Sequence, residues 1–136
     1  MSHQEPILVA CAIIEKDKRI LAAKRSRVQS HSGFWEFPGG KIAASESPET
    51  AVVREIKEEL CAAIRVKRRL DPATFEYPGK RVTLIPFVCD GSRALFVPLE
   101  HEEVRWVNGR ESESLAWLPP DQAILAAYLK SLPETP

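Results

Sequence analysis

Apolar and polar positions divide the chain into short runs of branched side chains and two segments with a helical period. Residues 7–14 are apolar and rich in branched side chains, and the polar turn 15–19 separates them from the apolar run 20–23. This pattern predicts a β-hairpin. Further strands are expected where apolar runs alternate with turn-forming residues, over 34–37, 64–70, 74–77, 81–89, 94–97 and 104–107.

Two segments carry the start signals of a helix. Ser47-Pro48-Glu49 places a capping hydroxyl, a proline at the first helical position and an acid in the first turn, so a helix is expected to about Leu60. A proline pair before Asp121 opens the second helix, whose apolar stripe is Ile124, Leu125, Tyr128 and Leu129. Strands interleaved with two helices predict an α/β fold, in which a mixed sheet is covered on both faces.

Length and composition are those of one globular domain, so residues 1–136 are expected to form a single unit. Lys plus Arg and Asp plus Glu number 19 each, and this balance disfavours a nucleic-acid polymer or an anionic membrane as partner. The N-terminus shows no signal peptide, and no apolar run approaches the ~20 residues of a membrane-spanning helix. A cytoplasmic protein is expected. Cys11, Cys61 and Cys89 form no C-x-x-C pair and are expected to be free, buried thiols.

Acidic residues gather on one face of the first expected helix. Glu55, Glu58 and Glu59 stand at i, i+3 and i+4, where like charges repel by a few tenths of a kcal/mol per pair. A solvated acidic face is one interpretation. A metal site is favoured because no lysines interleave with the acids at i+4 and because the Pro38-Gly39-Gly40 turn precedes the helix closely enough to fold back on it. Carboxylates and a backbone carbonyl make an all-oxygen site suited to Mg²⁺ or Mn²⁺.

A longer motif contains these acids and resembles a known family. Gly40, five residues, Glu46, seven residues and then 54–59 (Arg-Glu-Ile-Lys-Glu-Glu) is similar to the Nudix box of the Nudix hydrolases. Residues 34–41 and the Glu100-His101 pair ahead of Trp106 resemble the MutT and CTP pyrophosphohydrolase branch. The resemblance implies a Nudix-type α/β/α sandwich with a mixed β-sheet. It also implies magnesium-dependent hydrolysis of a nucleoside triphosphate to a monophosphate and diphosphate.

The resemblance assigns roles to residues of this chain. Glu55, Glu58 and Glu59, with the Gly40 carbonyl, are expected to hold the metal, while Arg54 and Glu46 orient these ligands. Glu100 is expected to be a further metal ligand or the general base, and the alternative is one more acid in a charged loop. His101 is interpreted as a loop residue and not as a ligand. The expected catalytic set is therefore Glu46, Arg54, Glu55, Glu58 and Glu100.

The same resemblance indicates the substrate contacts. Lys24 and Lys80 fall where that branch carries cations for phosphate or base contacts, and Phe37 and Tyr77 are expected to stack on the base. Asp121 stands where related proteins that prefer 8-oxo-guanine nucleotides have Asn. An ionised Asp accepts hydrogen bonds from the cytosine amine, so cytidine-type triphosphates are expected, with oxidised nucleotides such as 8-oxo-dGTP next. The alternative is that Asp121 only caps its helix.

The chain departs from the family pattern at one position, and two other functions remain as alternatives. Cys61 stands where the family has Gly, and the helix end is expected to adjust because a left-handed Cys costs on the order of 1 kcal/mol. The substrate of a Nudix enzyme is alternatively a nucleotide sugar, ADP-ribose or a dinucleoside polyphosphate. A non-catalytic base-binding module is the other class. A monomer and a homodimer are both compatible with the sequence.

Overall fold

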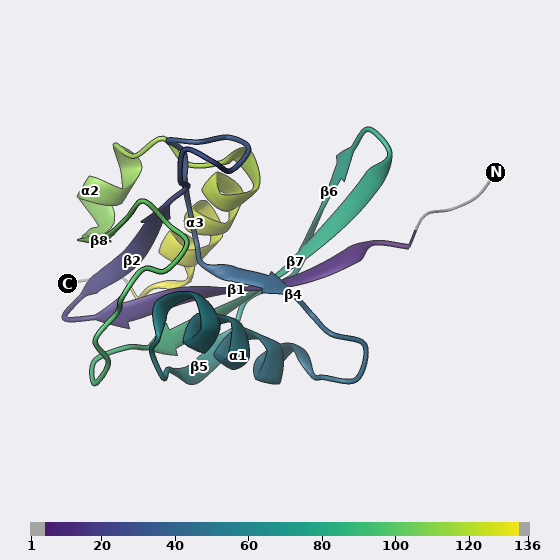
Figure 1. Cartoon of the computed structure of the whole chain (residues 1–136). Helices are drawn as coiled ribbons and strands as arrows, with labels where there is room; N and C mark the ends of the chain where they lie inside the picture. The colour runs from purple at the N-terminus through teal and green to yellow at the C-terminus, as the bar shows by residue number, and fades with distance from the viewer. Residues whose placement is uncertain (1–4, 134–136) are drawn as a thin grey trace.

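A computed structural model describes residues 5–133 of the chain (Figure 1). Its strands and helices are β1 (Ile7–Lys16), β2 (Arg19–Lys24), β3 (Trp35–Glu36), β4 (Gly39–Lys41), α1 (Pro48–Leu60), β5 (Arg65–Arg69), β6 (Ala73–Tyr77), β7 (Lys80–Asp90), β8 (Glu103–Val107), α2 (Gly109–Glu113) and α3 (Pro119–Ser131). None of the helices in this described part combines the length and the apolar character needed to cross a bilayer.

The strands form one mixed sheet, as the sequence pattern predicts. The order is β3-β2-β1-β7-β5, with β4 paired to β1, β6 to β7 and β8 to β2. Only β1 and β7, among the described pairs, run parallel, from Ile7 opposite Val82 to Glu15 opposite Asp90. The expected β1–β2 hairpin is confirmed, and its turn residues Asp17 and Lys18 have φ of 52° and 62°.

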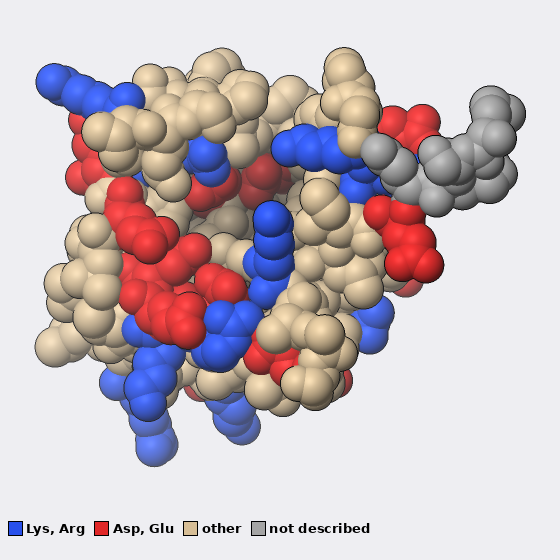
Figure 2. All heavy atoms as spheres, turned by 45° about the vertical axis from the view of Figure 1, so that its right-hand side comes forward, with Lys and Arg blue, Asp and Glu red and all other residues tan. Residues whose placement is uncertain are grey.

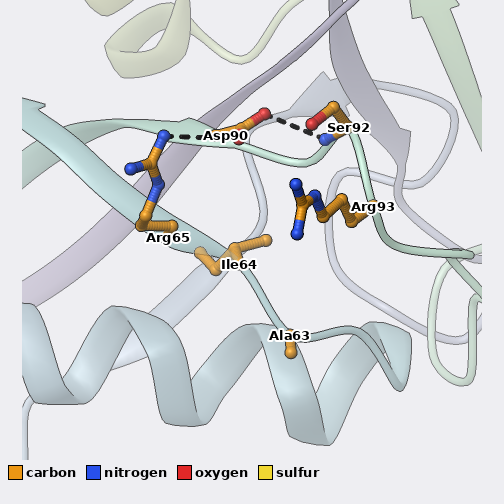
Figure 3. Close-up of a pocket in the computed structure, with 6 residues that line it drawn as sticks. All are labelled: Ala63, Ile64, Arg65, Asp90, Ser92 and Arg93. Carbon is orange, nitrogen blue, oxygen red and sulfur yellow. Dashed lines mark hydrogen bonds and ion pairs between the residues drawn. The ribbon is translucent and has the colours of Figure 1, made fainter.

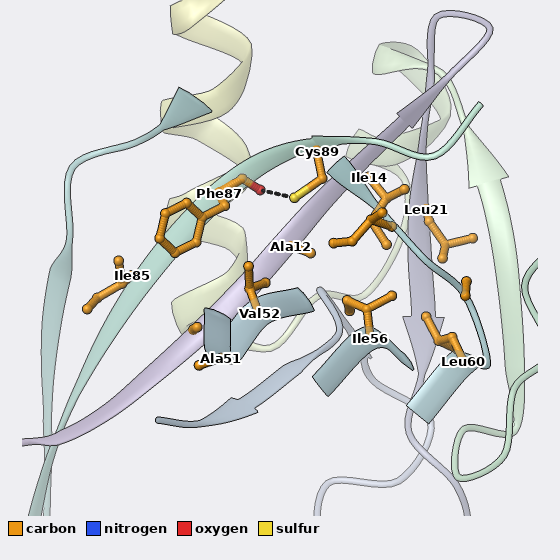
Figure 4. Packing of buried hydrophobic residues seen from close by; sticks show 13 residues of the cluster. Ala12, Ile14, Leu21, Ala51, Val52, Ile56, Leu60, Ile85, Phe87 and Cys89 are labelled. Carbon is orange, nitrogen blue, oxygen red and sulfur yellow. Dashed lines mark hydrogen bonds between the residues drawn. The ribbon is translucent and has the colours of Figure 1, made fainter. Parts of the chain in front are cut away.

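Helices cover both faces of the sheet because side chains alternate along the central strand. Ala10, Ala12 and Ile14 pack with α1 in one buried cluster (Figure 4). Cys11 and Ile13 point to the other face and join a cluster that includes α3. The expected apolar positions of the helices are buried at Val52, Ile56 and Leu60 in α1 and at Ile124, Leu125 and Tyr128 in α3. The α/β/α sandwich is therefore confirmed.

The expected strand over 94–97 is wrong. This segment is irregular, and the Val97 N–H donates to the Leu60 carbonyl (N···O 2.9 Å) while the Leu99 N–H donates to the Glu59 carbonyl (3.0 Å). The segment therefore satisfies the last carbonyls of α1, which have no partner within their own helix. The short helix α2 was not expected, although Asn108 and Glu111 form a reciprocal capping box at its start.

The expectations for the cysteines need two corrections. Cys61 adopts the left-handed conformation itself (φ 56°, ψ 28°) at the end of α1, so the helix end is not adjusted away from that geometry. Its N–H donates to the Lys57 carbonyl at 3.1 Å, which shows that the turn is completed despite the steric cost. Cys61 is also exposed, whereas Cys11 and Cys89 are buried free thiols as expected.

Candidate active site

The acidic residues of α1 are presented by a well-defined helix. The Ser47 hydroxyl accepts a hydrogen bond from the Thr50 N–H at 3.1 Å, so the expected cap is confirmed. Val52, Ile56 and Leu60 anchor the helix to the sheet, and Glu55, Glu58 and Glu59 stay outside the buried face. Figure 2 shows acidic side chains gathered beside a hollow on one face of the molecule.

Arg54 connects the acids of the box. Its guanidinium binds both oxygens of Glu46, at 3.0 and 2.5 Å, and its Nη1 also donates to Glu55 (3.0 Å) and Glu58 (3.1 Å). The hydrogen bond from Arg54, followed by one from the Ala43 N–H, lowers the pKa of Glu46 to about 2. The structure therefore brings Arg54 and Glu46 together, with the guanidinium in contact with two of the three acids of the helix face.

Glu59 has the most perturbed environment of the three acids. Its Oε2 is buried and has no hydrogen-bond partner among the described residues. Burial raises the pKa of Glu59 to about 8, and the charges of Glu55, Glu100 and Glu36 add to the shift, while a backbone hydrogen bond from Gly39 opposes it. A buried carboxyl that is surrounded by other carboxylates is stabilised in its ionised form by a cation.

The Gly39–Gly40 backbone lies directly against the acidic face. In β4, Gly40 pairs with Ala10 and Gly39 with Cys11, so the expected turn is a short strand held by β1. A Cβ on Gly40 would lie 2.5 and 2.6 Å from the two carboxylate oxygens of Glu55. Any larger residue at position 40 would therefore displace the Glu55 carboxylate, whereas glycine leaves the backbone next to the carboxylate open.

These residues fit a divalent cation in their chemistry, although their carboxylates do not all point to a common centre. Within residues 5–133, no group of three or more His, Cys, Asp or Glu side chains converges as a ready metal site. The contacts above give the reason, since Glu55 and Glu58 turn toward Arg54. Two observations favour a cation here: the Glu59 oxygen that has no hydrogen-bond partner within residues 5–133, and the glycine opening beside Glu55.

Asp121 is buried at the start of α3 and bonds to the short segment that precedes the glycines. Its Oδ1 accepts the Phe37 N–H at 2.9 Å, across 84 positions of sequence. Burial, with a smaller contribution from the Glu36 charge, raises the pKa of Asp121 to about 7. The N-cap of α3 is Leu118, which makes no side-chain capping bond. Asp121 therefore links α3 to the segment between β3 and β4.

The two aromatic residues expected to stack on a base differ in accessibility. The Phe37 ring is 4% exposed and stacks on Trp117 at a centroid distance of 4.6 Å, so it lies in the core. Tyr77 is 40% exposed, and the Lys80 ammonium lies 5.6 Å from its ring centroid. Burial, with a smaller contribution from the Asp121 charge, raises the pKa of Tyr77. Tyr77, and not Phe37, presents an accessible ring.

Two residues of the site were not identified from the sequence. His101, interpreted there as a loop residue, is 8% exposed, and its Nε2 lies 2.9 Å from Oε2 of Glu36. The other oxygen of Glu36 accepts from Arg25 at 2.8 Å. The acid inside the aromatic run 34–37 was the available signal for Glu36. Lys24, the expected phosphate contact, lies 3.6 Å from Glu102.

A cavity of about 490 Å³ lies elsewhere, beyond the C-terminal end of α1 (Figure 3). Asp90 accepts the Ser92 N–H at 3.0 Å and lies 3.6 Å from the Arg65 guanidinium. No residue of the expected site lines this cavity, whose wall is formed by Ala63, Ile64, Arg65, Asp90, Ser92 and Arg93. The cavity is therefore separate from the acidic face.

Comparison with known proteins identifies the family. Residues 5–134 match the model of the NUDIX domain, so the chain belongs to the Nudix hydrolases, enzymes that act on phosphoric anhydrides and generally use divalent metal ions. The chain is 32% identical over 123 residues to the CTP pyrophosphohydrolase of Escherichia coli K12. The matched region covers 90% of this chain and 91% of that protein. It is 35% identical over 88 residues to the 8-oxo-dGTP diphosphatase of Proteus vulgaris, covering 65% and 79%.

Solved structures agree with this assignment. The solution structure of the Escherichia coli ORF135 protein superimposes with a TM-score of 0.81 at 31% identity, over 93% of this chain and 90% of that one. The MutT NUDIX hydrolase of Burkholderia pseudomallei gives 0.70 at 27% identity, over 91% and 98%. The family that the box resembles is thus confirmed.

Proposed function

We propose that this chain, as a single Nudix domain, hydrolyses nucleoside triphosphates to monophosphates and diphosphate with Mg²⁺ as cofactor. The preferred substrates are cytidine-type nucleotides or oxidised ones such as 8-oxo-dGTP, whose removal sanitises the nucleotide pool. The observation that carries this proposal is the buried carboxylate oxygen of Glu59 on the acidic face of α1, which has no hydrogen-bond partner in the part of the chain that the structure describes. The similarity to a CTP pyrophosphohydrolase and to an 8-oxo-dGTP diphosphatase supports the substrate class.

The metal would be held by Glu55, Glu58 and Glu59, with the Gly40 carbonyl and Glu100 completing the protein ligands. An all-oxygen set of this kind suits Mg²⁺ and also accepts Mn²⁺. When bound, the ion neutralises phosphate charge and lowers the pKa of the attacking water. Arg54, held by Glu46, keeps Glu55 and Glu58 on the same side of α1.

Two lysines would then position the triphosphate, and one acid would accept a proton. Lys24 and Lys80 bind phosphate oxygens, which orients the chain of phosphates along the acidic face. The water oxygen forms a bond to the β-phosphorus, and the bond from that phosphorus to the α,β-bridging oxygen breaks. The monophosphate leaves with the bridging oxygen, and Glu100 accepts the proton of the water.

The base is recognised at the start of α3. Tyr77 stacks on the ring through its exposed face. Asp121 faces the exocyclic groups, and a pKa of about 7 makes both of its protonation states accessible. The ionised form accepts from the cytosine amine, and the protonated form donates to 8-oxo-guanine. Cytidine-type triphosphates are therefore hydrolysed better than dGTP.

The experiment is a substrate panel in ¹⁸O-labelled water with products separated by ion exchange. It includes CTP, dCTP, dGTP, 8-oxo-dGTP, ADP-ribose and a UDP-sugar, each with and without excess EDTA. The proposal expects diphosphate carrying the label, an unlabelled monophosphate and no turnover in EDTA. Label in the monophosphate would show attack on the α-phosphorus, and exclusive turnover of ADP-ribose or the UDP-sugar would replace the substrate class.

Two variants on α1 test the helix face. Glu58→Gln removes one charge from the proposed metal site and is expected to lower kcat by about 100-fold or more while the fold survives, because the side chain is 59% exposed. Glu49→Gln removes an acid from the first turn of the same helix and is the matched control, expected to stay within about twofold of the parent. A Glu58→Gln enzyme as active as this control contradicts the proposed metal site.

A further inference from the structure

The segment that carries Glu100 is fastened on both sides of that residue. On one side, the Leu99 N–H donates to the Glu59 carbonyl at 3.0 Å, which ties the segment to α1. On the other side, the His101 imidazole contacts Glu36 in β3 at 2.9 Å. Next to it, the Glu102 N–H donates to the Lys24 carbonyl at 2.9 Å. Glu100 thus lies between an attachment to α1 and attachments to β2 and β3.

Burial distinguishes His101 from its neighbours. The His101 side chain is 2% exposed, while Glu100 and Glu102 are exposed on either side. The Glu36 carboxylate uses one oxygen for His101 and the other for Arg25, so it is fixed from two directions. A buried hydrogen bond to a fixed carboxylate holds the ring, and the ring holds the backbone of the exposed segment.

The position of Glu100 depends on these attachments, because the residue itself is exposed. The Leu99 N–H bond to the Glu59 carbonyl places Glu100 on a segment next to Glu59, and the two side chains carry like charges. Like charges on neighbouring segments repel, and the contacts made by His101 and Glu102 oppose that repulsion. Groups behind metal ligands commonly fix ligand orientation in this way.

We infer that His101 is a positioning residue: through its hydrogen bond to Glu36 it holds Glu100 over the acidic face of α1, where Glu100 contributes to binding a divalent cation. The inference rests on the proposed function for the role of Glu100. It adds His101 and Glu36 to the residues on which that site depends, with Arg25 holding Glu36 in place.

The test is a double-mutant cycle that measures cation binding without substrate. Mn²⁺ affinity is determined by electron paramagnetic resonance for the parent, His101→Leu, Glu100→Gln and the double variant, together with kcat and KM for CTP. His101→Leu is expected to weaken Mn²⁺ binding and to lower kcat by about tenfold or more, with KM for the nucleotide changed by less than about threefold. In the Glu100→Gln background the same substitution is expected to change Mn²⁺ affinity by less than about twofold, because its effect passes through Glu100.

Further variants separate positioning from simple folding effects. His101→Gln, whose amide nitrogen can stand in place of Nε2, is expected to recover Mn²⁺ affinity to within about threefold of the parent. Glu103→Gln removes a nearby, half-exposed charge that bonds only to Arg105 among the described residues, and it is expected to behave as the parent. If His101→Leu does not fold, His101→Asn is used, since its shorter side chain cannot reach Glu36.

Each result decides the question. An undiminished Mn²⁺ affinity in His101→Leu, or an equal loss with and without Glu100, overturns the positioning role. Loss in His101→Gln as large as in His101→Leu also overturns it, because the hydrogen bond would not be the cause. The binding cycle uses no nucleotide, so it can succeed even when CTP is not a substrate, and failure of the proposed substrate is seen separately in the panel.

Discussion

Replacing Asp121 by Asn removes the ionisable group from a buried position while keeping an oxygen that can accept the Phe37 N–H. The parent carboxyl is 7% exposed, and burial raises its pKa from the ordinary value of 3.8 to about 7. The folded protein therefore holds a proton, between about pH 4 and pH 7, that the unfolded chain has already released. This proton stabilises the folded state. Its contribution to the free energy of unfolding is complete below about pH 4, falls as the pH rises and is lost above about pH 7.

The size of the effect follows from the shift. Three pKa units at about 1.36 kcal/mol each give about 4 kcal/mol once both states are ionised. Between about pH 5 and about pH 8, the free energy of unfolding of the parent is expected to fall by about 2–3 kcal/mol through this group. The neutral Asn of the variant makes no such contribution. The variant keeps the contact with Phe37, so its own stability should vary with pH through the remaining groups alone.

Urea unfolding of metal-free protein measures this difference at a series of pH values. The free energy of Asp121→Asn relative to the parent is expected to rise by about 2–3 kcal/mol between about pH 5 and about pH 8. Asp71→Asn, at an exposed position, is the matched control and should run parallel to the parent. A relative free energy for Asp121→Asn that stays constant to within about 0.5 kcal/mol over this range would refute the buried, proton-binding state of Asp121.

Three further predictions concern the base, the end of α1 and the core. Asp121→Asn should reduce the preference for CTP over dGTP, measured as the ratio of their kcat/KM values, by the equivalent of about 1–3 kcal/mol. An unchanged ratio would place base recognition elsewhere. Cys61→Gly should raise the free energy of unfolding by about 1 kcal/mol because φ is 56° and the thiol is exposed; Ala63→Gly is the control, and no gain would contradict the strain. Ile56→Ala should lower it by about 2–5 kcal/mol, whereas the half-exposed Val53→Ala should cost far less, and equal losses would contradict the assigned face of α1.

Much of the fold was readable in the sequence because its signals are local. The Ser47-Pro48 start, the acidic face of α1 and the β1–β2 hairpin depend on residues within a few positions of one another, and the structure confirms them. The interleaving of strands with two helices also predicted a sheet with two covered faces, and the buried clusters on either side of β1 confirm it. The box spacing identified the family, since it fixes residue types over a short stretch of chain.

Contacts between distant segments were decided only by the tertiary structure. An apolar pattern over 94–97 suggests a strand, but Val97 and the following Leu99 instead donate their N–H groups to carbonyls at the end of α1. His101 becomes a buried partner of Glu36 across 65 positions, and Asp121 a partner of Phe37 across 84. Periodicity reports which face of an element is apolar, because it depends on the element alone. The partner of a polar side chain depends on how the sheet brings elements together, and that information lies in the packing of the whole chain.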